Sequence, residues 1–239
     1  MGQAICNNSS PFLIILIPSI PNNKEVRNAI RTTWGSIAKG GVWPRKSVNV
    51  KIKLAFLLGM SDPENLTLTK LINEESTTYG DLIEGNFTDS YYNLTLKILL
   101  GLKWYIGPEG KILGCISLHS PVLRSGKWKL DKSLYPFPRY PKYVSGCSYF
   151  ISINVVPRLF QISEYFPYIS IEDAFITGML AKSVNTAVAA LPGVTYWGEK
   201  LARSCDFVLD KKISGLVNIK RLHAIWKKMN SENLKMLTS

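Results

Sequence analysis

The stretch FLIILIPSIPNNKEVRNAIRTTWG, residues 12–35, decides the fold class. Its first six residues are all apolar, which is typical of a strand buried on both faces in a parallel sheet. The residues from Pro21 onward predict a helix, because Asn22 and Glu25 have the spacing of a capping box and Gly35 is placed to end it. A buried strand that leads directly into a helix indicates an α/β fold.

Strand and helix patterns continue along the rest of the chain. They predict strands at residues 50–59, 111–118 and 142–153, and helices at residues 66–80, 93–107, 170–183 and 217–229. The segment 127–141 is rich in Pro, Tyr and Lys without periodicity, so we expect a loop there. The sequence shows no internal repeat and no linker. We therefore expect one domain over residues 12–230, with tails at 1–11 and 231–239.

The chain is strongly basic. It has 29 Lys and Arg against 17 Asp and Glu, a formal net charge of +12 that makes the surface attractive to phosphates and other anions. The basic residues are scattered, and the sequence has neither an RNA-binding aromatic signature nor a zinc-finger pattern. We expect no nucleic-acid partner, and general polyanion binding remains an alternative that rests on charge alone.

The number of N-glycosylation acceptors favours the secretory lumen, whereas the cysteines leave the compartment open. The four cysteines allow two disulfides with three pairings, and no apolar run approaches the roughly 18 residues of a membrane span. If the protein is lumenal, we expect its targeting segment to lie outside this chain. The main indication is the number of Asn-x-Ser/Thr acceptors for N-glycosylation, which occur at Asn7, Asn8, Asn65, Asn86 and Asn93.

Two neighbouring carboxylates, Glu172 and Asp173, stand in the stretch SIEDAFITG, residues 170–178. One interpretation is structural: Ser170 as N-cap and Asp173 three residues later satisfy the free amides of a helix start. The other is catalytic, with Asp173 as a general base beside a cleft. The two interpretations are compatible.

Two further positions are candidates for ligand contact. Arg27 and Arg31 are four residues apart and share a helix face, from which both could reach a diphosphate at the end of the first strand. The alternative is an exposed basic helix face. Gly146, within SGCSY, allows the backbone to approach another group closely.

The order of these motifs resembles a known family. RNAIRTTWG (27–35), FLLG (56–59), YGDLIEGNFTDSYYNLTLKILLGLKW (79–104), YPKYVSGCSYFIS (140–152) and IEDAFITGMLA (171–181) resemble the β-1,3-galactosyltransferases, which are hexosyltransferases of glycosyltransferase family 31. The resemblance covers most of residues 12–229. It implies a GT-A-like, Rossmann-like α/β fold with a mostly parallel central sheet.

The resemblance also implies an activity and a place for it. A UDP-sugar donor would give its sugar to a glycan acceptor with inversion, on the lumenal side of the Golgi membrane, in a protein held there by an N-terminal anchor that this chain does not contain. Asp173 matches the family's base, and Glu172 would orient the helix or bind the acceptor. Arg27 and Arg31 would contact the donor, and Gly146 and Tyr149 would belong to the acceptor loop.

The sequence departs from the family pattern at the metal site. The family binds a divalent ion, usually Mn²⁺, through an Asp-x-Asp motif, and none of the seven aspartates of this chain has that spacing. We therefore identify no metal ligand, and we expect an internal deletion near residues 105–111 that removes one core strand. Ser148 also replaces a glycine of the family's SGTGY. The alternative to an active transferase is an inactive relative that binds a sugar or nucleotide, or assists another transferase.

Overall fold

The computed structural model describes residues 11–44, 46–61, 64–102, 110–194, 206–207 and 217–231. The chain divides into two compact units within the predicted domain. Unit 1 comprises Met1–Asp89, Leu201–Lys211 and Val217–Ser239, and unit 2 comprises Ser90–Lys200 and Lys212–Leu216.

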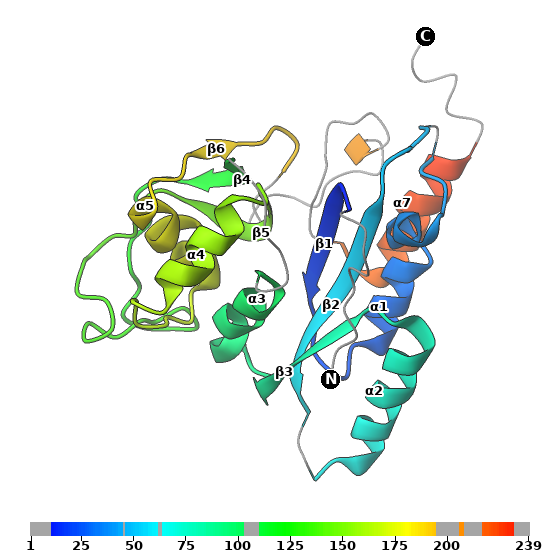
Figure 1. The fold of residues 1–239 in the computed structure, drawn as a ribbon, viewed down its shortest axis with the longest axis horizontal. Coiled ribbons are helices and arrows are strands. Elements are labelled where there is room, and N and C mark those ends of the chain that lie inside the picture. The colour runs from blue at the N-terminus through cyan, green and yellow to red at the C-terminus, as the bar shows by residue number, and fades with distance from the viewer. Residues whose placement is uncertain are drawn as a thin grey trace. The chain divides into compact units, whose positions relative to one another are not determined.

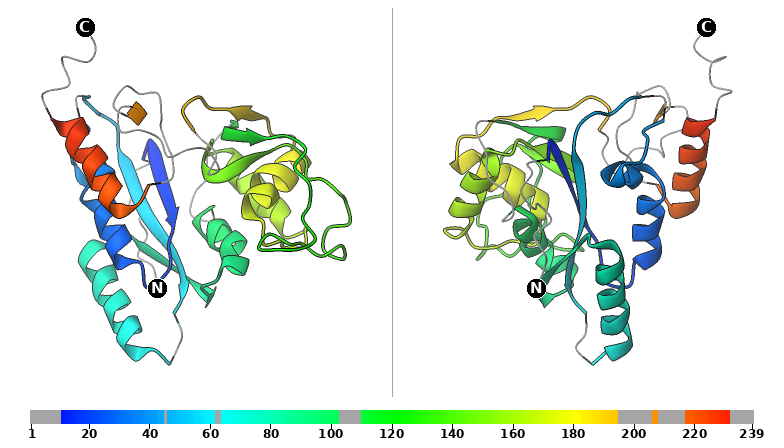
Figure 2. Two further views of the ribbon diagram at one scale, coloured as in Figure 1. Left: turned by 180° about the vertical axis from the view of Figure 1, so that it is seen from behind. Right: turned by 45° about the vertical axis from the view of Figure 1, so that its right-hand side comes forward.

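Unit 1 is a parallel three-stranded sheet with helices on one face (Figures 1 and 2). The strand order is β1-β2-β3, and both neighbouring pairs are parallel. The parallel sheet predicted from the first strand is therefore confirmed here. The elements are β1 (Leu13–Pro18), α1 (Lys24–Arg31), the 3₁₀ helix η1 (Trp34–Lys39), β2 (Ile52–Met60), α2 (Leu66–Tyr79), β3 (Leu82–Thr88) and α7 (Ile219–Asn230).

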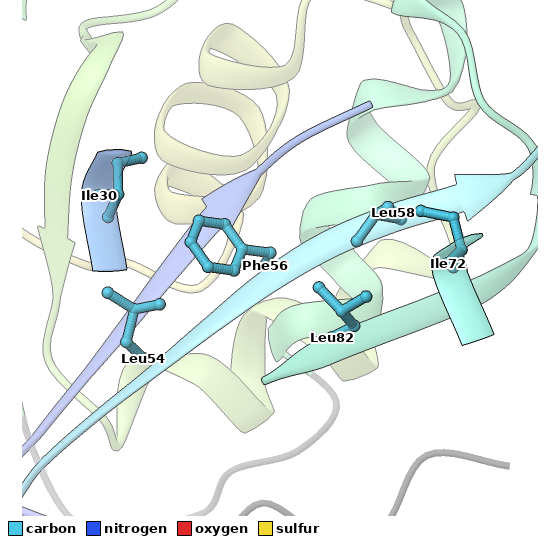
Figure 3. Packing of buried hydrophobic residues seen from close by; sticks show 6 residues of the cluster. All are labelled: Ile30, Leu54, Phe56, Leu58, Ile72 and Leu82. Carbon is cyan, nitrogen blue, oxygen red and sulfur yellow. The ribbon is translucent and has the colours of Figure 1, made fainter. Parts of the chain in front are cut away.

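The core of unit 1 lies between this sheet and its helices. Alternate residues of the central strand β2 point into the core, where they meet one residue each from α1, α2 and β3 (Figure 3). Leu222 of α7 packs against the same cluster. Burial of these side chains, worth roughly 1.5–3 kcal/mol each, fixes α1 and α2 against the sheet. The cluster consists of Ile30, Leu54, Phe56, Leu58, Ile72 and Leu82.

The first helix is shorter than its sequence predicts. It begins at Lys24, after an N-cap Asn23 whose side chain makes no capping hydrogen bond, so the predicted capping box at Asn22 and Glu25 is wrong. Gly35 does not end the helix either. It lies inside η1, where a Cβ atom would come within 2.7 Å of the Ile30 carbonyl oxygen. The chain turns instead at Gly40, whose φ of 81° favours glycine.

Unit 2 is built on a mixed sheet of order β5-β4-β6, in which β4 pairs antiparallel with β5 and parallel with β6. The predicted single, mostly parallel sheet therefore does not extend to these strands, because the antiparallel pair β4–β5 begins a second sheet. The elements are the 3₁₀ turn η2 (Tyr91–Asn93), α3 (Leu94–Leu102), β4 (Ile112–Ser117), β5 (Tyr143–Ile151), α4 (Val155–Ser163), the π-helix η3 (Ala174–Leu180), α5 (Ala181–Ser183) and β6 (Val188–Ala190).

The segment that carries the two carboxylates is helical, as predicted, but most of it is a π-helix. Two α-helical residues, Glu172 and Asp173, lead into η3, and all seven residues of η3 are buried. Thr177 ties η3 to β5, because its hydroxyl oxygen accepts a hydrogen bond from the Val144 amide at 2.8 Å. π-Helical turns are rare and frequently mark functional sites.

The sequence did not predict the strands β3 and β6, the helix α4 or the 3₁₀ helix η1. The predicted helix 93–107 is observed as α3 up to Leu102, and residues 103–109, where most of the expected deletion falls, lie outside the described residues. Within the residues that the structure describes, no helix is long and apolar enough to cross a membrane.

Candidate active site around Asp173

Asp173 is held at the start of its helix by two backbone amides. Its Oδ1 accepts a hydrogen bond from the Ala174 amide at 2.8 Å, and its Oδ2 accepts one from the Gly146 amide of β5, also at 2.8 Å. The prediction that Asp173 caps its helix is confirmed, whereas the predicted register is wrong, because the helix begins at Glu172 rather than directly after Ser170. The carboxylate is half-buried, so it is both fixed and partly accessible.

Gly146 makes this contact possible. A Cβ atom at this position would lie 3.2 Å from Asp173 Oδ2, closer than most real Cβ atoms approach a neighbour, and at an ordinary contact distance of 3.5 Å from Asp173 Cβ and Cγ. The group that approaches the Gly146 backbone, which the sequence left unidentified, is therefore the Asp173 carboxylate. Strand β5 is irregular here, since its register against β4 shifts between Gly114 and Ile116.

Glu172 points to a different partner on the same strand. Its carboxylate accepts a short hydrogen bond from the hydroxyl of Tyr149, and only 7% of the residue is exposed. Consecutive residues of the helix thus contact two positions of β5: Asp173 at Gly146 and Glu172 at Tyr149. The structure brings together four of the predicted site residues.

Burial separates the protonation states of the two acids. It raises the pKa of Glu172 to about 8, with a further contribution from the charge of Asp173 and against the hydrogen bond from Tyr149. Burial also raises the pKa of Asp173, but the amides of Ala174 and Gly146 oppose this effect. Near neutral pH, Glu172 is therefore mostly protonated. Asp173 differs from it in having two amide donors that favour its charged form, and such unlike environments can give two carboxyl groups two roles.

Tyr149 stays a hydrogen-bond donor throughout this range. Burial raises the pKa of its hydroxyl well above the ordinary value, and the neighbouring charges of Glu172 and Asp173 act in the same direction. The pair of Tyr149 and Glu172 is therefore a stable link between β5 and the helix start at neutral pH.

Arg27, predicted as a donor-site residue, lies in unit 1 and is fully buried. The Nε–H group and one N–H of Nη2 donate hydrogen bonds to the Glu75 carboxylate. The remaining N–H groups donate to the Ser19 hydroxyl and to the carbonyls of Ile20 and Pro21. These contacts occupy all five donors of the guanidinium. Arg27 therefore has no donor left for a diphosphate in this structure, and can affect a ligand only by fixing the turn after β1.

Arg31 belongs to the same network. It donates to both oxygens of Asp81, to Glu75 and to Asn28, and its guanidinium carbon lies 4.0 Å from the ring centroid of Tyr79. Burial opposes its charge, but the hydrogen bonds and charges of Asp81 and Glu75 raise its pKa. The predicted exposed face of basic residues is thus a buried ion-pair network between α1, α2 and the start of β3.

The predicted N-glycosylation sites differ in how exposed they are. Asn65 and Asn86 are exposed, Asn93 is half-buried, and Asn7 and Asn8 lie outside the described residues. Asn65 also caps α2, because its side-chain oxygen accepts a hydrogen bond from the Leu68 amide. Across the part of the chain that the structure describes, no three His, Cys, Asp or Glu side chains come together as metal ligands do.

The sequence did not single out Tyr91, Tyr92 or Trp128, three aromatic residues near the carboxylates. Tyr91 lies close enough to Glu172 and Asp173 for their charges to act on its pKa, which burial chiefly raises, and its hydroxyl is hydrogen-bonded by Trp128. Beside these residues is a hollow of about 400 Å³, whose lining includes Tyr92 and reaches Ser170, two residues before Glu172. The motif DSYYNLTLK was the available signal, because it places two adjacent tyrosines before a buried helix.

Comparison with known proteins places this geometry in context. The sequence profile of a family described as "Galactosyltransferase" matches residues 25–116 and 109–192. Beta-1,3-galactosyltransferase 5 of Pan paniscus is 30% identical over 219 residues, covering 78% of this chain and 69% of the relative. Beta-1,3-galactosyltransferase 2 of Homo sapiens is 31% identical over 214 residues, covering 74% of this chain and 49% of the relative.

The first of these alignments shows that the chain is shorter than its relative within the matched region. The 219 aligned positions exceed the 78% of 239 residues that they cover, so the relative has residues inside the matched region that this chain lacks. The two segments of the profile match meet at residues 109–116, next to the predicted deletion. The second segment contains β5 and the helix start, and hence Gly146, Tyr149, Glu172 and Asp173.

Proposed function

The chain belongs to the galactosyltransferase family, which makes it a hexosyltransferase, and we propose that it transfers a hexose from a UDP-sugar to a glycan hydroxyl with inversion at the anomeric carbon. The mixed α/β structure with its parallel three-stranded sheet is consistent with the GT-A-like fold expected for such an enzyme. Similarity to β-1,3-galactosyltransferases favours a β1,3 linkage and does not favour the inactive alternative.

One observation carries the proposal. The family match includes both β5 and the helix start, and the structure joins these two segments through the contact of Asp173 with Gly146 and of Glu172 with Tyr149. If Asp173 had a structural role alone, it would not need a neighbouring acid such as Glu172 in a different environment. The pair of environments is what a general base and its supporting group require.

Asp173 is the base in this mechanism. As the acceptor oxygen attacks the anomeric carbon, the C–O bond to the diphosphate breaks and the acceptor proton passes to Asp173. The two amide hydrogen bonds fix the carboxylate, while burial raises its pKa and so makes it a stronger base than an exposed aspartate. General base catalysis of this kind typically contributes ~10²–10⁴-fold to the rate.

Glu172 limits the negative charge beside the base. Because it is mostly protonated near neutral pH and hydrogen-bonded to Tyr149, it adds little negative charge beside Asp173. Its protonated state therefore spares Asp173 the repulsion that would raise the pKa of the base further.

The family's Mn²⁺ does not fit the described residues, because they provide no cluster of three metal-ligating side chains. We therefore derive no step of the reaction through a metal ion. Arg27 and Arg31 are committed to the ion-pair network of unit 1. The contribution of Arg27 to donor binding would be to hold the turn at Ser19–Pro21, and that of Arg31 would be to fix Glu75, the partner of Arg27.

The proposed place of action is the lumenal side of the Golgi membrane. Exposed Asn-x-Ser/Thr acceptors at Asn65 and Asn86 support exposure to the glycosylation machinery. Expression in a mammalian cell line, together with the N-terminal targeting segment expected above, should give a protein whose mass falls on treatment with peptide N-glycosidase F, and immunofluorescence should overlap a Golgi marker. An unglycosylated protein, or one found outside the secretory pathway, would contradict this assignment.

The transfer reaction is tested with UDP-galactose and UDP-N-acetylglucosamine, each with a panel of β-glycoside acceptors, in the presence of Mn²⁺ and of a chelator. We expect product from the parent, and at least a hundredfold less from Asp173→Asn, which should still fold but lose one of the two amide hydrogen bonds, at a cost of about 1 kcal/mol. Glu164→Gln, which changes an exposed carboxylate of the same unit, is the matched control. Full activity of Asp173→Asn would exclude this residue as the base, and UDP binding without any turnover would support the inactive alternative.

A further inference from the structure

Unit 2 has an aromatic cluster beside the two carboxylates. The rings of Tyr91 and Tyr92 meet edge to face, with their centroids 6.4 Å apart. The Nζ of Lys127 lies 5.1 Å from the ring centroid of Tyr91 and 5.7 Å from that of Trp128, so this cation bridges the two rings. The turn η2 and the long irregular segment before β5 therefore meet at one point.

The hydroxyl of Tyr91 is oriented within this cluster. The Trp128 side chain hydrogen-bonds it, and an indole N–H can only donate, so the tyrosine oxygen is the acceptor. The Tyr91 O–H is thus left to donate to another oxygen. Burial chiefly raises the pKa of Tyr91, and the charges of Asp173 and Glu172 add to this effect, so both acids lie near the Tyr91 hydroxyl.

The hollow of about 400 Å³ continues from the cluster. Tyr92, 69% exposed, belongs to both the cluster and the lining of the hollow. The lining also includes polar groups of Asn93, Lys129 and Asp131. A volume of this size lies within the usual range for small-molecule sites, about 300–1,000 Å³.

The wall of the hollow is held rigidly. Arg124 donates to the carbonyls of Leu130, Tyr135 and Phe137, which closes the irregular segment on itself. On another side the lining reaches Ser170. Three Cα steps separate Ser170 from Asp173, so their Cα atoms are at most about 11 Å apart. A short oligosaccharide seated in the hollow would therefore end near the proposed base.

We propose that this hollow binds the sugar acceptor, with a pyranose face against the ring of Tyr92 and the reacting hydroxyl directed past Tyr91 to Asp173. The C–H face of a pyranose is weakly positive and matches the negative face of an aromatic ring. Asn93, Lys129 and Asp131 supply donors and acceptors for sugar hydroxyls. This assignment rests on the proposed transferase function and names the part of the molecule that selects the acceptor.

Direct binding without a donor tests the site. Saturation-transfer NMR is recorded with p-nitrophenyl β-N-acetylglucosaminide and methyl β-galactopyranoside, on the parent chain and on Tyr92→Ala, Tyr92→Phe and Tyr165→Ala. Tyr165 is an equally open tyrosine, 81% exposed, outside this hollow. We expect Tyr92→Ala to weaken glycoside binding about tenfold, equivalent to ~1.4 kcal/mol. Tyr92→Phe, which keeps the ring, and Tyr165→Ala should bind as the parent does.

The outcomes separate this inference from the proposed function. Equal binding by Tyr92→Ala and the parent, loss of binding in Tyr165→Ala, or no glycoside binding by the parent at millimolar concentration would each overturn the acceptor site. Displacement of the glycoside by UDP would also overturn it, because the hollow would then belong to the donor. UDP release from a UDP-sugar in the absence of acceptor, measured on the parent and on Tyr165→Ala, reports the proposed function independently of this hollow, and the two rates should be equal.

Discussion

Replacing Glu172 by glutamine should stabilise the protein in a strongly pH-dependent manner. A buried carboxyl group whose pKa rises from its ordinary value of 4.5 to about 8 binds a proton in the folded state that it releases in the unfolded state. Between these two values, the folded state binds more protons than the unfolded state, so each pH unit removes ~1.4 kcal/mol of stability. Glu172 thus costs nothing below pH 4.5 and costs most above pH 8.

The shift corresponds to an upper limit of ~5 kcal/mol at high pH. The glutamine side chain would still be buried and would still accept the hydrogen bond from Tyr149, so the variant would lose only the cost of the charge. We expect a gain of about 3–5 kcal/mol at pH 9 and less than about 1 kcal/mol at pH 5. At about 2–4 °C per kcal/mol, the melting temperature at pH 9 should rise by on the order of 10 °C.

Thermal unfolding followed by circular dichroism at pH 5, 7 and 9 measures this difference. Glu164→Gln, an exposed carboxylate in the same unit, should shift the melting temperature equally little at all three pH values. If the difference between Glu172→Gln and the parent were the same at pH 5 and pH 9, Glu172 would not be the buried, protonated group described above, and its supporting role for Asp173 would fail with it.

Two other perturbations test the contacts on which the site depends. Glu75→Gln leaves two buried arginines without a shared carboxylate and should cost about 3–5 kcal/mol at pH 7, while Glu74→Gln on the exposed side of α2 should cost almost nothing in denaturant unfolding. Because Arg27 and Arg31 lower the Glu75 pKa against the effect of burial, this stabilisation should be present above pH 4.5 and be lost as the pH falls further. Gly146→Ala should displace the Asp173 carboxylate and reduce transfer by ~10-fold or more, with a smaller effect on the melting temperature; unchanged turnover would show that this contact does not orient the base.

The sequence predicted the elements whose side chains follow a clear pattern. Strands β1 and β2 are nearly continuous apolar runs, because a parallel sheet buries them on both faces, and both were found within two residues of their predicted limits. Strand β3 was missed, since LIEGNFT mixes Glu, Gly and Asn with only a few apolar residues and the strand gains its stability from its neighbour β2.

The π-helix could not be predicted from the pattern either. All seven residues of AFITGML are buried, so no polar face reveals the helical period, and the hydrogen bonds that distinguish a π-helix from an α-helix leave no trace in composition. The burial of Arg27 was hidden for a related reason. Arginine is mostly exposed in proteins, and its carboxylate partner Glu75 lies 48 residues away in the sequence.

The motif of two adjacent acids combines a structural and a chemical role because of helix geometry. Consecutive residues on a helix point in different directions, so one helix start cannot place Glu172 and Asp173 in the same environment. Glu172 turns into the protein, where Tyr149 accompanies it and burial keeps it protonated, whereas Asp173 turns to the Gly146 amide and stays partly open. If Asp173 served only as a helix cap, the buried neighbour Glu172 would bring no advantage, because its burial weakens the fold above pH 5. The destabilisation is understandable if the pair serves catalysis, since active sites commonly trade stability for function.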